Sequence, residues 1–171
     1  IDPDSDPITY EYQWFEDDIL LTEQTRNRLQ LSFTSKDRTY RVVVTPSDGE
    51  TQGPNESAEI TIQNSPPSPP EILISTSEVG GELVCIIEEP STDPDSDTIS
   101  YAFQWYLNDQ LYSGSPSTTE LSGDTISGSM NSEEHFWMCE VTASDGESQS
   151  TVAQTTVWDP GFDIQCWGRD Q

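Results

Sequence analysis

The amino-acid sequence predicts an all-β protein built as two tandem sandwich units. The first reason is an internal repeat: DPDSDPITYEYQWF at residues 2–15 returns as DPDSDTISYAFQWY at residues 93–106. The second is that the candidate strands are short and separated by turn residues at the spacing typical of β-sandwiches. The third is composition, because Ser, Thr, Asp, Pro and Gly are abundant whereas Ala and Lys are scarce. A chain of 171 residues is long enough for two domains of about 85 residues each.

The charge of the chain limits its partners. There are 32 acidic and 6 basic residues, which gives a net charge of −26. Nucleic acids and anionic membrane surfaces would be repelled, because binding to either depends on Lys and Arg. Cations, basic proteins and neutral polymers such as glycans remain as partners, and a solvated acidic surface is the simpler explanation of the charge. No apolar run is long enough to span a bilayer, so we expect no membrane insertion.

The first unit, residues 1–63, contains its candidate strands in a regular order. Alternating apolar and polar residues over 8–14 predict a strand with one buried face, and we expect Trp14 to lie in the core. Asp17 and Asp18 predict a turn into a short return strand at 19–21. Further strands are expected at 29–33 and 40–44, then a turn at 47–49 and a last strand at 58–62.

A proline-rich stretch at 64–70 separates the units, and its fixed φ angles predict a short, stiff linker. The second unit covers residues 71–157, and the repeat places Trp105 91 residues after Trp14 and Asp145 97 residues after Asp48 (105 − 14 and 145 − 48). The six extra residues are expected in an exposed loop at 113–123. The strands expected in this unit are 72–75, 83–87, 99–107, 110–112, 125–130, 135–143 and 150–157.

The first unit lacks a counterpart of residues 72–87, which are the first two strands of the second unit. A sandwich without those strands would expose apolar faces and an unpaired edge. Two explanations are open: the strands precede this sequence in a longer repeat array, or another chain supplies them.

Cys85, Trp105 and Cys139 lie on the second, third and sixth principal strands expected in the second unit, and this pattern resembles an immunoglobulin-like sandwich. Trp137 takes the place of the corner tyrosine that such domains often have, whereas Tyr40 keeps that tyrosine in the first unit. The acidic run, the Tyr-x-Trp strand pattern and the SDGE turn resemble the immunoglobulin-like and cadherin-like repeats of large bacterial surface proteins. The resemblance implies a Cys85–Cys139 disulfide and an extracellular or cell-surface location; two buried thiols are the alternative.

The acidic runs are candidate calcium sites, because carboxylates two residues apart in an extended loop lie on the same side and calcium prefers oxygen ligands. In an immunoglobulin-like sandwich the turn after the Cys139 strand lies at the same end as the acidic loop. A calcium ion there could stiffen the joint between the units, as in the cadherin-like repeats that the chain resembles. A solvated turn with side chains capping backbone amides is the alternative. The candidate ligands are Asp93, Asp95, Asp97, Asp145 and Glu147, with Asp2, Asp4, Asp6, Asp48 and Glu50 in the first unit.

The sequence also contains a glycosylation sequon and a patterned tail. Asn55 begins an Asn-Glu-Ser glycosylation sequon. Residues 158–171 form a tail in which Phe162, Ile164 and Cys166 alternate with polar or aromatic residues. This tail could add as a strand to the open first unit of a neighbouring copy, or it could begin a further domain.

No arrangement of residues suggests catalysis, since the lone His135 has no serine or cysteine partner at a known spacing. We therefore expect a non-enzymatic, extracellular structural or adhesive segment, such as part of a stalk or filament. It could assemble head to tail and be stiffened by Ca²⁺. A glycan- or protein-binding module is the alternative, with Trp158 and Trp167 as the candidate exposed aromatic residues.

Overall fold

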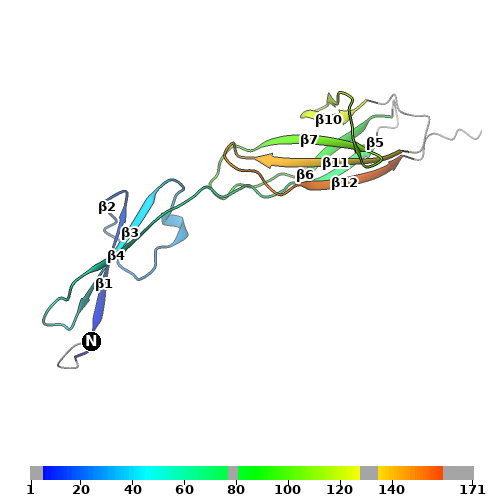
Figure 1. Cartoon of the computed structure of the whole chain (residues 1–171). Coiled ribbons are helices and arrows are strands. Elements are labelled where there is room, and N and C mark those ends of the chain that lie inside the picture. The colour runs from blue at the N-terminus through cyan, green and yellow to red at the C-terminus, as the bar shows by residue number, and fades with distance from the viewer. Residues whose placement is uncertain (1–5, 77–80, 128–134, 160–171) are drawn as a thin grey trace, which may run out of the picture. The chain divides into compact units, whose positions relative to one another are not determined.

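The computed structural model describes residues 6–76, 81–127 and 135–159, and within these ranges the regular secondary structure is all β-strand apart from one short 3-10 helix. The chain divides into two compact units, Ile1–Ser65 and Pro66–Gln171, which are described separately (Figure 1). No helix among these described residues is long and apolar enough to cross a membrane. The predicted all-β class is confirmed.

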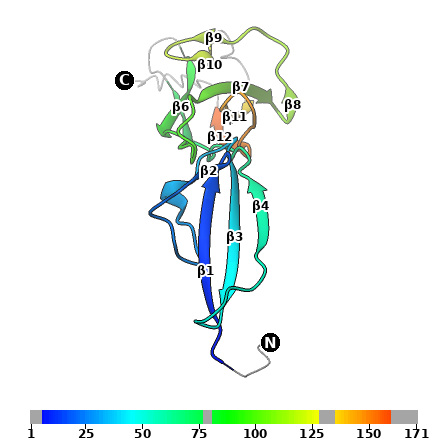
Figure 2. The same ribbon diagram turned by 90° about the vertical axis from the view of Figure 1, so that its left-hand side faces the viewer.

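Unit 1 contains one antiparallel sheet with the strand order β2-β1-β3-β4 (Figure 2). Its strands are β1 (Thr9–Glu16), β2 (Ile19–Leu20), β3 (Thr39–Ser47) and β4 (Glu56–Thr61). Asp17 and Asp18 connect β1 to β2 with φ angles of 44° and 66°, which is the left-handed geometry of a two-residue hairpin turn. Asp17 also accepts hydrogen bonds from the backbone N–H of Thr39 and from Arg38, so this turn is tied to β3.

The strand predicted at 29–33 is wrong. Residues Leu31–Phe33 form a short 3-10 helix, η1, in which Leu31 is 87% exposed and Phe33 is 48% exposed. The physical reason is the lack of a neighbour among the described residues of unit 1, because a strand needs a partner for its backbone groups. In unit 2 the residue that corresponds to Leu29 is Ile126, which ends β10 and pairs with Leu83 of β6; residues 128–130 lie outside the described ranges.

Unit 2 contains two four-stranded antiparallel sheets. One has the order β5-β6-β10-β9, formed by β5 (Glu71–Thr76), β6 (Leu83–Glu89), β9 (Ser117–Thr118) and β10 (Ser122–Ile126). The other has the order β12-β11-β7-β8, formed by β7 (Ser100–Leu107), β8 (Gln110–Leu111), β11 (His135–Ser144) and β12 (Ala153–Asp159). The core between them contains Leu83, Cys85, Trp105, Ile126, Trp137, Cys139 and Val141.

Three expectations for unit 2 need adjustment. The loop expected at 113–123 is largely exposed, but it contains β9 and the start of β10. The strand expected at 125–130 begins earlier and ends at Ile126, and residues 128–130 lie outside the described ranges. The proline-rich stretch is attached to unit 2, because the N–H of Ser68 donates to the carbonyl oxygen of Thr92 at 2.9 Å and the N–H of Thr92 donates to Ser68 Oγ at 2.9 Å.

The sheet of unit 1 and the second sheet of unit 2 have the same register. Trp14 pairs with Val42 as Trp105 pairs with Cys139, at offsets of 91 (105 − 14) and 97 (139 − 42). Tyr40 pairs with Ile60 as Trp137 pairs with Val157, again offset by 97 on both strands. The cores differ, however: Trp105 is 2% exposed, whereas Trp14 is only half-buried. The expectation that Trp14 is a core residue is therefore wrong, because no second sheet covers it within the described residues of unit 1.

Candidate functional site

The acidic loop between β6 and β7 brings three carboxylates together. One oxygen from each of Asp93, Asp95 and Asp97 lies within 4.8 Å of the others, and all three residues are half-buried. Asp93 shapes this loop, because its Oδ1 accepts hydrogen bonds from the backbone N–H of Asp95 at 2.8 Å and of Asp97 at 3.1 Å. Ser96 takes a φ of 66°, which turns the backbone between the last two carboxylates.

Asp93 caps two backbone amides through Oδ1, as the capped-turn alternative expects, and its second carboxylate oxygen takes no part in that capping. Asp93 Oδ2 is buried and has no hydrogen-bond partner. A buried charged oxygen without a partner is costly, and a cation would satisfy it. Calcium binds oxygens at about 2.3–2.6 Å, so ligands on opposite sides of the ion are about 5 Å apart. Three carboxylate oxygens at this spacing could hold a metal ion, and acidic clusters of this kind also occur without one.

The acidic loop and the SDGE turn lie at the same end of unit 2, since Ser100 pairs with Ser144 directly after the loop and before the turn (Figure 1). The carboxylate cluster nevertheless consists of Asp93, Asp95 and Asp97 and includes neither Asp145 nor Glu147. Asp145 Oδ1 accepts the backbone N–H groups of Glu147 at 2.7 Å and of Ser148 at 2.6 Å. This aspartate therefore holds the turn in which Gly146 has a φ of 95°.

Asp48 has the same role in unit 1. Its Oδ1 accepts the backbone N–H of Glu50 and of Thr51, and its Oδ2 accepts the hydroxyl of Thr51. The bonds from Thr51 and Glu50 stabilise the ionised form and lower the pKa of Asp48 below its ordinary value. Asp6 and Glu50 are exposed, and Asp2 and Asp4 lie outside the described residues.

The remaining predicted site residues lie apart from the acidic loop in the sequence. Asn55 is exposed and directly precedes β4, so its side chain is accessible. Trp158 lies on the edge strand β12 and is 56% exposed. Phe162, Ile164, Cys166 and Trp167 lie outside the described residues.

The disulfide implied by the family resemblance is present: Cys85 on β6 is bonded to Cys139 on β11 and joins the two sheets of unit 2. Trp105 and Trp137 pack beside it in an edge-to-face arrangement, with ring centroids 6.2 Å apart. Tyr40 keeps the corner geometry in unit 1, because its hydroxyl accepts the backbone N–H of Ser35 at 3.0 Å and donates to Glu16 at 2.8 Å.

Asp124 is a buried charged residue that was not predicted from the sequence. Asp124 is 3% exposed, and its carboxylate accepts the backbone N–H groups of Thr119, Glu120 and Leu121, each at 2.8 Å. Burial disfavours the charged carboxylate, but these bonds and one from the Thr125 hydroxyl outweigh it and hold the pKa of Asp124 below its ordinary value. The sequence signal was weak, because an aspartate after Ser-Gly resembles any solvated turn.

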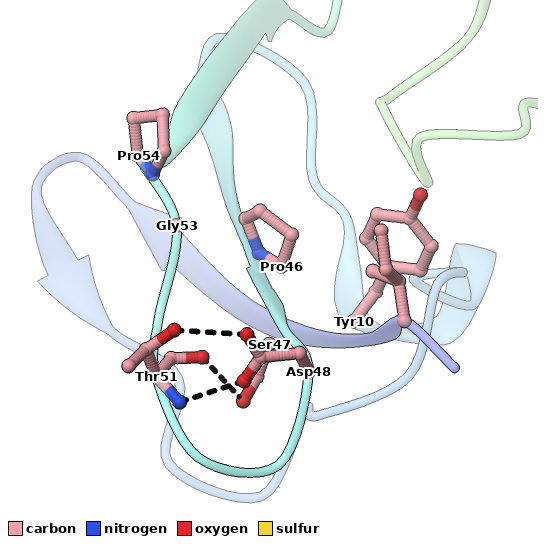
Figure 3. A pocket seen from close by; sticks show the side chains of 8 residues that line it. Tyr10, Pro46, Ser47, Asp48, Thr51, Gly53 and Pro54 are labelled. Carbon is pink, nitrogen blue, oxygen red and sulfur yellow. Dashed lines mark hydrogen bonds between the residues drawn. The ribbon is translucent and has the colours of Figure 1, made fainter. Parts of the chain in front are cut away.

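A hollow of about 440 Å³ lies at the end of unit 1 where β1 begins and β3 ends (Figure 3). Ile8 is among the residues that line it, and in Figure 3 Tyr10 lies on one side and Pro46, Gly53 and Pro54 lie on the other. Asp48 and Thr51 form its rim, where their hydrogen bonds close the turn (Figure 3). Tyr10 is 57% exposed, so this hollow has an aromatic wall open to solvent.

These features define the class of the protein. Unit 2 has the two-sheet order, the inter-sheet disulfide and the buried tryptophan of an immunoglobulin-like sandwich, and unit 1 contains one sheet of the same register.

Comparisons with known proteins add little to that class. No family model matches the chain, and no curated protein matches it. The chain is similar to a solved structure of the selenomethionine-substituted chicken interferon gamma receptor alpha chain. The alignment covers 91% of this chain and 87% of the receptor chain, with 12% sequence identity and a TM-score of 0.40.

Proposed function

We propose that the chain is a non-enzymatic structural or adhesive segment of an extracellular protein built from tandem immunoglobulin-like repeats, such as part of a stalk. The observation that carries this proposal is the common register of the two sheets, in which Trp14–Val42 corresponds to Trp105–Cys139. Units of one design joined by a short proline-rich stretch suit a protein that sets distance between its ends. The resemblance to repeats of bacterial surface proteins supports the same function.

An extracellular location is supported by the covalent chemistry of the core. Disulfides form and persist in oxidising compartments, and Cys85–Cys139 joins the two sheets of unit 2. The charge of −26 is also compatible with an exposed, highly hydrated surface.

We further propose that Asp93, Asp95 and Asp97 bind calcium and that the ion stiffens the attachment of the proline-rich stretch. The support is the spacing of their oxygens and the unpartnered Asp93 Oδ2. Thr92, which shares three hydrogen bonds with Ser68, is the residue before Asp93. A calcium ion that fixes the acidic loop would therefore also restrain Thr92 and, through its hydrogen bonds, the proline-rich stretch at the start of unit 2.

The test of the calcium site is thermal unfolding of unit 2 with and without millimolar calcium. We expect calcium to raise the melting temperature of the unmodified chain, and the double variant Asp93→Asn, Asp95→Asn to lose that rise. The matched control is Glu88→Gln with Glu89→Gln, which removes two exposed charges from β6 and should respond to calcium normally. No rise in the unmodified chain would remove calcium from the proposal and leave the repeat architecture intact.

Self-assembly belongs to the same proposal and has a separate test. The tail at 162–166 lies outside the described residues, so its part rests on the sequence alternation alone. Head-to-tail assembly should give end-to-end polymers in negative-stain images, and polymers should be lost when the chain is shortened to residue 159. Single particles at all concentrations would contradict assembly by this chain.

A second candidate function is glycan binding, and the exposed Trp158 favours it. An indole that is 56% exposed on an edge strand can stack on a sugar ring. Glycan-array binding that is lost on changing Trp158 to Ala, and kept on changing the buried Trp105 to Phe, would support this candidate. Absence of binding by the unmodified chain would exclude it for the glycans on the array.

A further inference from the structure

The sheet of unit 1 has one strongly apolar face. Cross-strand pairing places Tyr12 beside Val44 and Trp14 beside Val42 and Ala58 on this face. Tyr10 and Pro46 continue it to the hollow of Figure 3, and Ile60 continues it on β4. Tyr10 is 57% exposed and Ile60 is 63% exposed, and among the described residues of unit 1 Tyr40 is the sole buried hydrophobic side chain.

Unit 2 shows what covers the equivalent face. There the β5–β6 hairpin and β10 lie over the sheet, and Leu83, Cys85 and Ile126 pack into one core with Trp105 and Trp137. Ile72 and Ile74 of β5 pack against the same core. The face in unit 2 thus becomes a core only because a second sheet is present.

Unit 1 already contains one part of that second layer. Trp105 donates its indole N–H to the carbonyl oxygen of Gly123 at 2.9 Å, and Trp14 makes the equivalent bond to Arg26 at 2.8 Å. The offset is 97 (123 − 26), so the segment after Arg26 corresponds to β10 and Leu29 corresponds to Ile126. Ile126 pairs with Leu83 and is 2% exposed, whereas the segment containing Leu29 forms no strand. The missing element is therefore the counterpart of the β5–β6 hairpin.

The hollow beside Tyr10 indicates how that hairpin would enter. In unit 2 the hydroxyl of Tyr101 accepts the backbone N–H of Ser91, just after β6, at 2.9 Å. Tyr10 corresponds to Tyr101 (101 − 91), so the counterpart of Ser91 would fall immediately before Ile1. A segment at that place would fill the hollow between Ile8, Tyr10 and Pro46 (Figure 3).

We propose that the apolar face and the hollow of unit 1 are the docking surface for a β-hairpin patterned like Glu71–Glu89, joined to the amino end of β1 in the same polypeptide. The proposal rests on the common repeat architecture but not on calcium or on a stalk function. Val42 stands where unit 2 has Cys139, so the hairpin would contribute an aliphatic residue in place of Cys85. The exposed Arg26 and Arg28 border the expected edge, and they suit a hairpin as acidic as Glu82–Glu89.

The charge of the chain disfavours a second copy as the occupant of this face, and the hairpin competes here with the head-to-tail contact made by the tail of a neighbouring copy. Two copies meeting through this face would bring together two chains that each carry −26. Pairing in the same polypeptide also avoids the entropy lost when two molecules associate.

The test attaches residues 66–92, with Cys85→Val, directly before Asp2 of the full chain, which reproduces the spacing of unit 2. Amide hydrogen exchange is then measured residue by residue. We expect exchange at Leu29 and its neighbours to slow by about tenfold or more as this segment becomes a strand. The Tyr10 and Trp14 side chains should become protected from solvent, which near-ultraviolet and fluorescence spectra report.

The matched control is the same extension with Ile72, Ile74 and Leu83 changed to Ser, which keeps its length and charge. It should leave exchange at Leu29 unchanged. Unit 2 in each protein serves as the internal standard, because its amide exchange rates should be the same with either extension. Equal exchange at Leu29 with both extensions would overturn the proposal. A concentration-dependent dimer of the unextended chain, dissociated by Tyr12→Ser, would instead identify a second copy as the occupant and would also overturn it.

Adding residues 66–92 with Cys85→Val as a separate peptide gives an independent measurement if the extended chain does not fold. Slowed exchange at Leu29 supports the same surface, and unchanged exchange at saturating peptide counts against it. All of these measurements are repeated with and without calcium. Unchanged exchange at Leu29 together with a normal calcium response of unit 2 would overturn the docking proposal and leave the proposed function intact.

Discussion

Val42 lies opposite Trp14 in the pairing of β1 with β3, at the place that Cys139 holds opposite Trp105 in unit 2. Two sheets with the same strand register are therefore packed differently in the two units. In unit 2 the strand opposite the tryptophan is cross-linked to a second sheet, and in unit 1 the same position carries an aliphatic side chain on an open face. The stability of the two units should therefore respond differently to equivalent changes.

The disulfide is the first such difference. Changing both Cys85 and Cys139 to Ala should lower the free energy of unfolding of unit 2 by about 2–5 kcal/mol, because the unfolded chain loses a cross-link over 54 residues. Unit 1 should be unaffected. Denaturant unfolding followed by amide signals assigned to each unit measures both. Equal loss in the two units would mean that they do not unfold independently.

The two tryptophans give the second difference. Trp105→Ala should cost about 3–5 kcal/mol, since the side chain is 2% exposed and lies within the core cluster. Trp14→Ala should cost about 1–2 kcal/mol, because this half-buried ring loses less burial and one hydrogen bond to Arg26. The comparison uses the same unit-specific unfolding measurement. A cost for Trp14 equal to that for Trp105 would show that unit 1 has a complete core.

Asp124 should make unit 2 sensitive to acid. Its pKa is lower in the folded state than in the unfolded state, because three backbone N–H groups and the Thr125 hydroxyl favour the carboxylate despite its burial. Its contribution is therefore present above the unfolded pKa of about 4 and is lost as the pH falls through the folded value. Asp124→Asn should destabilise unit 2 at neutral pH by about 1–3 kcal/mol and weaken the acid dependence of unfolding. The exposed change Asp109→Asn is the control and should do neither.

Tyr40 should stabilise unit 1 through its hydroxyl. Tyr40→Phe leaves the N–H of Ser35 without its acceptor and Glu16 without a donor, at a cost of about 1–2 kcal/mol. Tyr106→Phe in unit 2 is the control, because that hydroxyl bonds to the Glu140 side chain alone and the change should cost less. Unfolding of each unit by heat measures the two effects. A loss as large for Tyr106 as for Tyr40 would contradict a special role of the bond to the Ser35 backbone.

Local patterns in the sequence predicted most of the strands. The alternation at Tyr10, Tyr12 and Trp14 predicted β1 because residues on one face of a strand recur every second position. The acidic turns were also predictable, since Asp-Asp and Asp-Gly pairs favour left-handed geometry. The prediction at 29–33 failed because alternation reports the capacity of a segment to be a strand and not the presence of a partner.

By itself the sequence determined the all-β class, the repeat spacing and the aspartates of the acidic loop, because these depend on residue type and short-range order. Only the tertiary structure decided which residues are buried. It joined Cys85 to Cys139, grouped Asp93, Asp95 and Asp97 without Asp145, and enclosed Asp124 within its own loop. It also left Trp14 half-buried where Trp105 is enclosed. Burial depends on which distant parts of the chain pack against a face. The nearly identical sequences of β1 and β7 therefore do not reveal that Trp14 and Trp105 differ in burial.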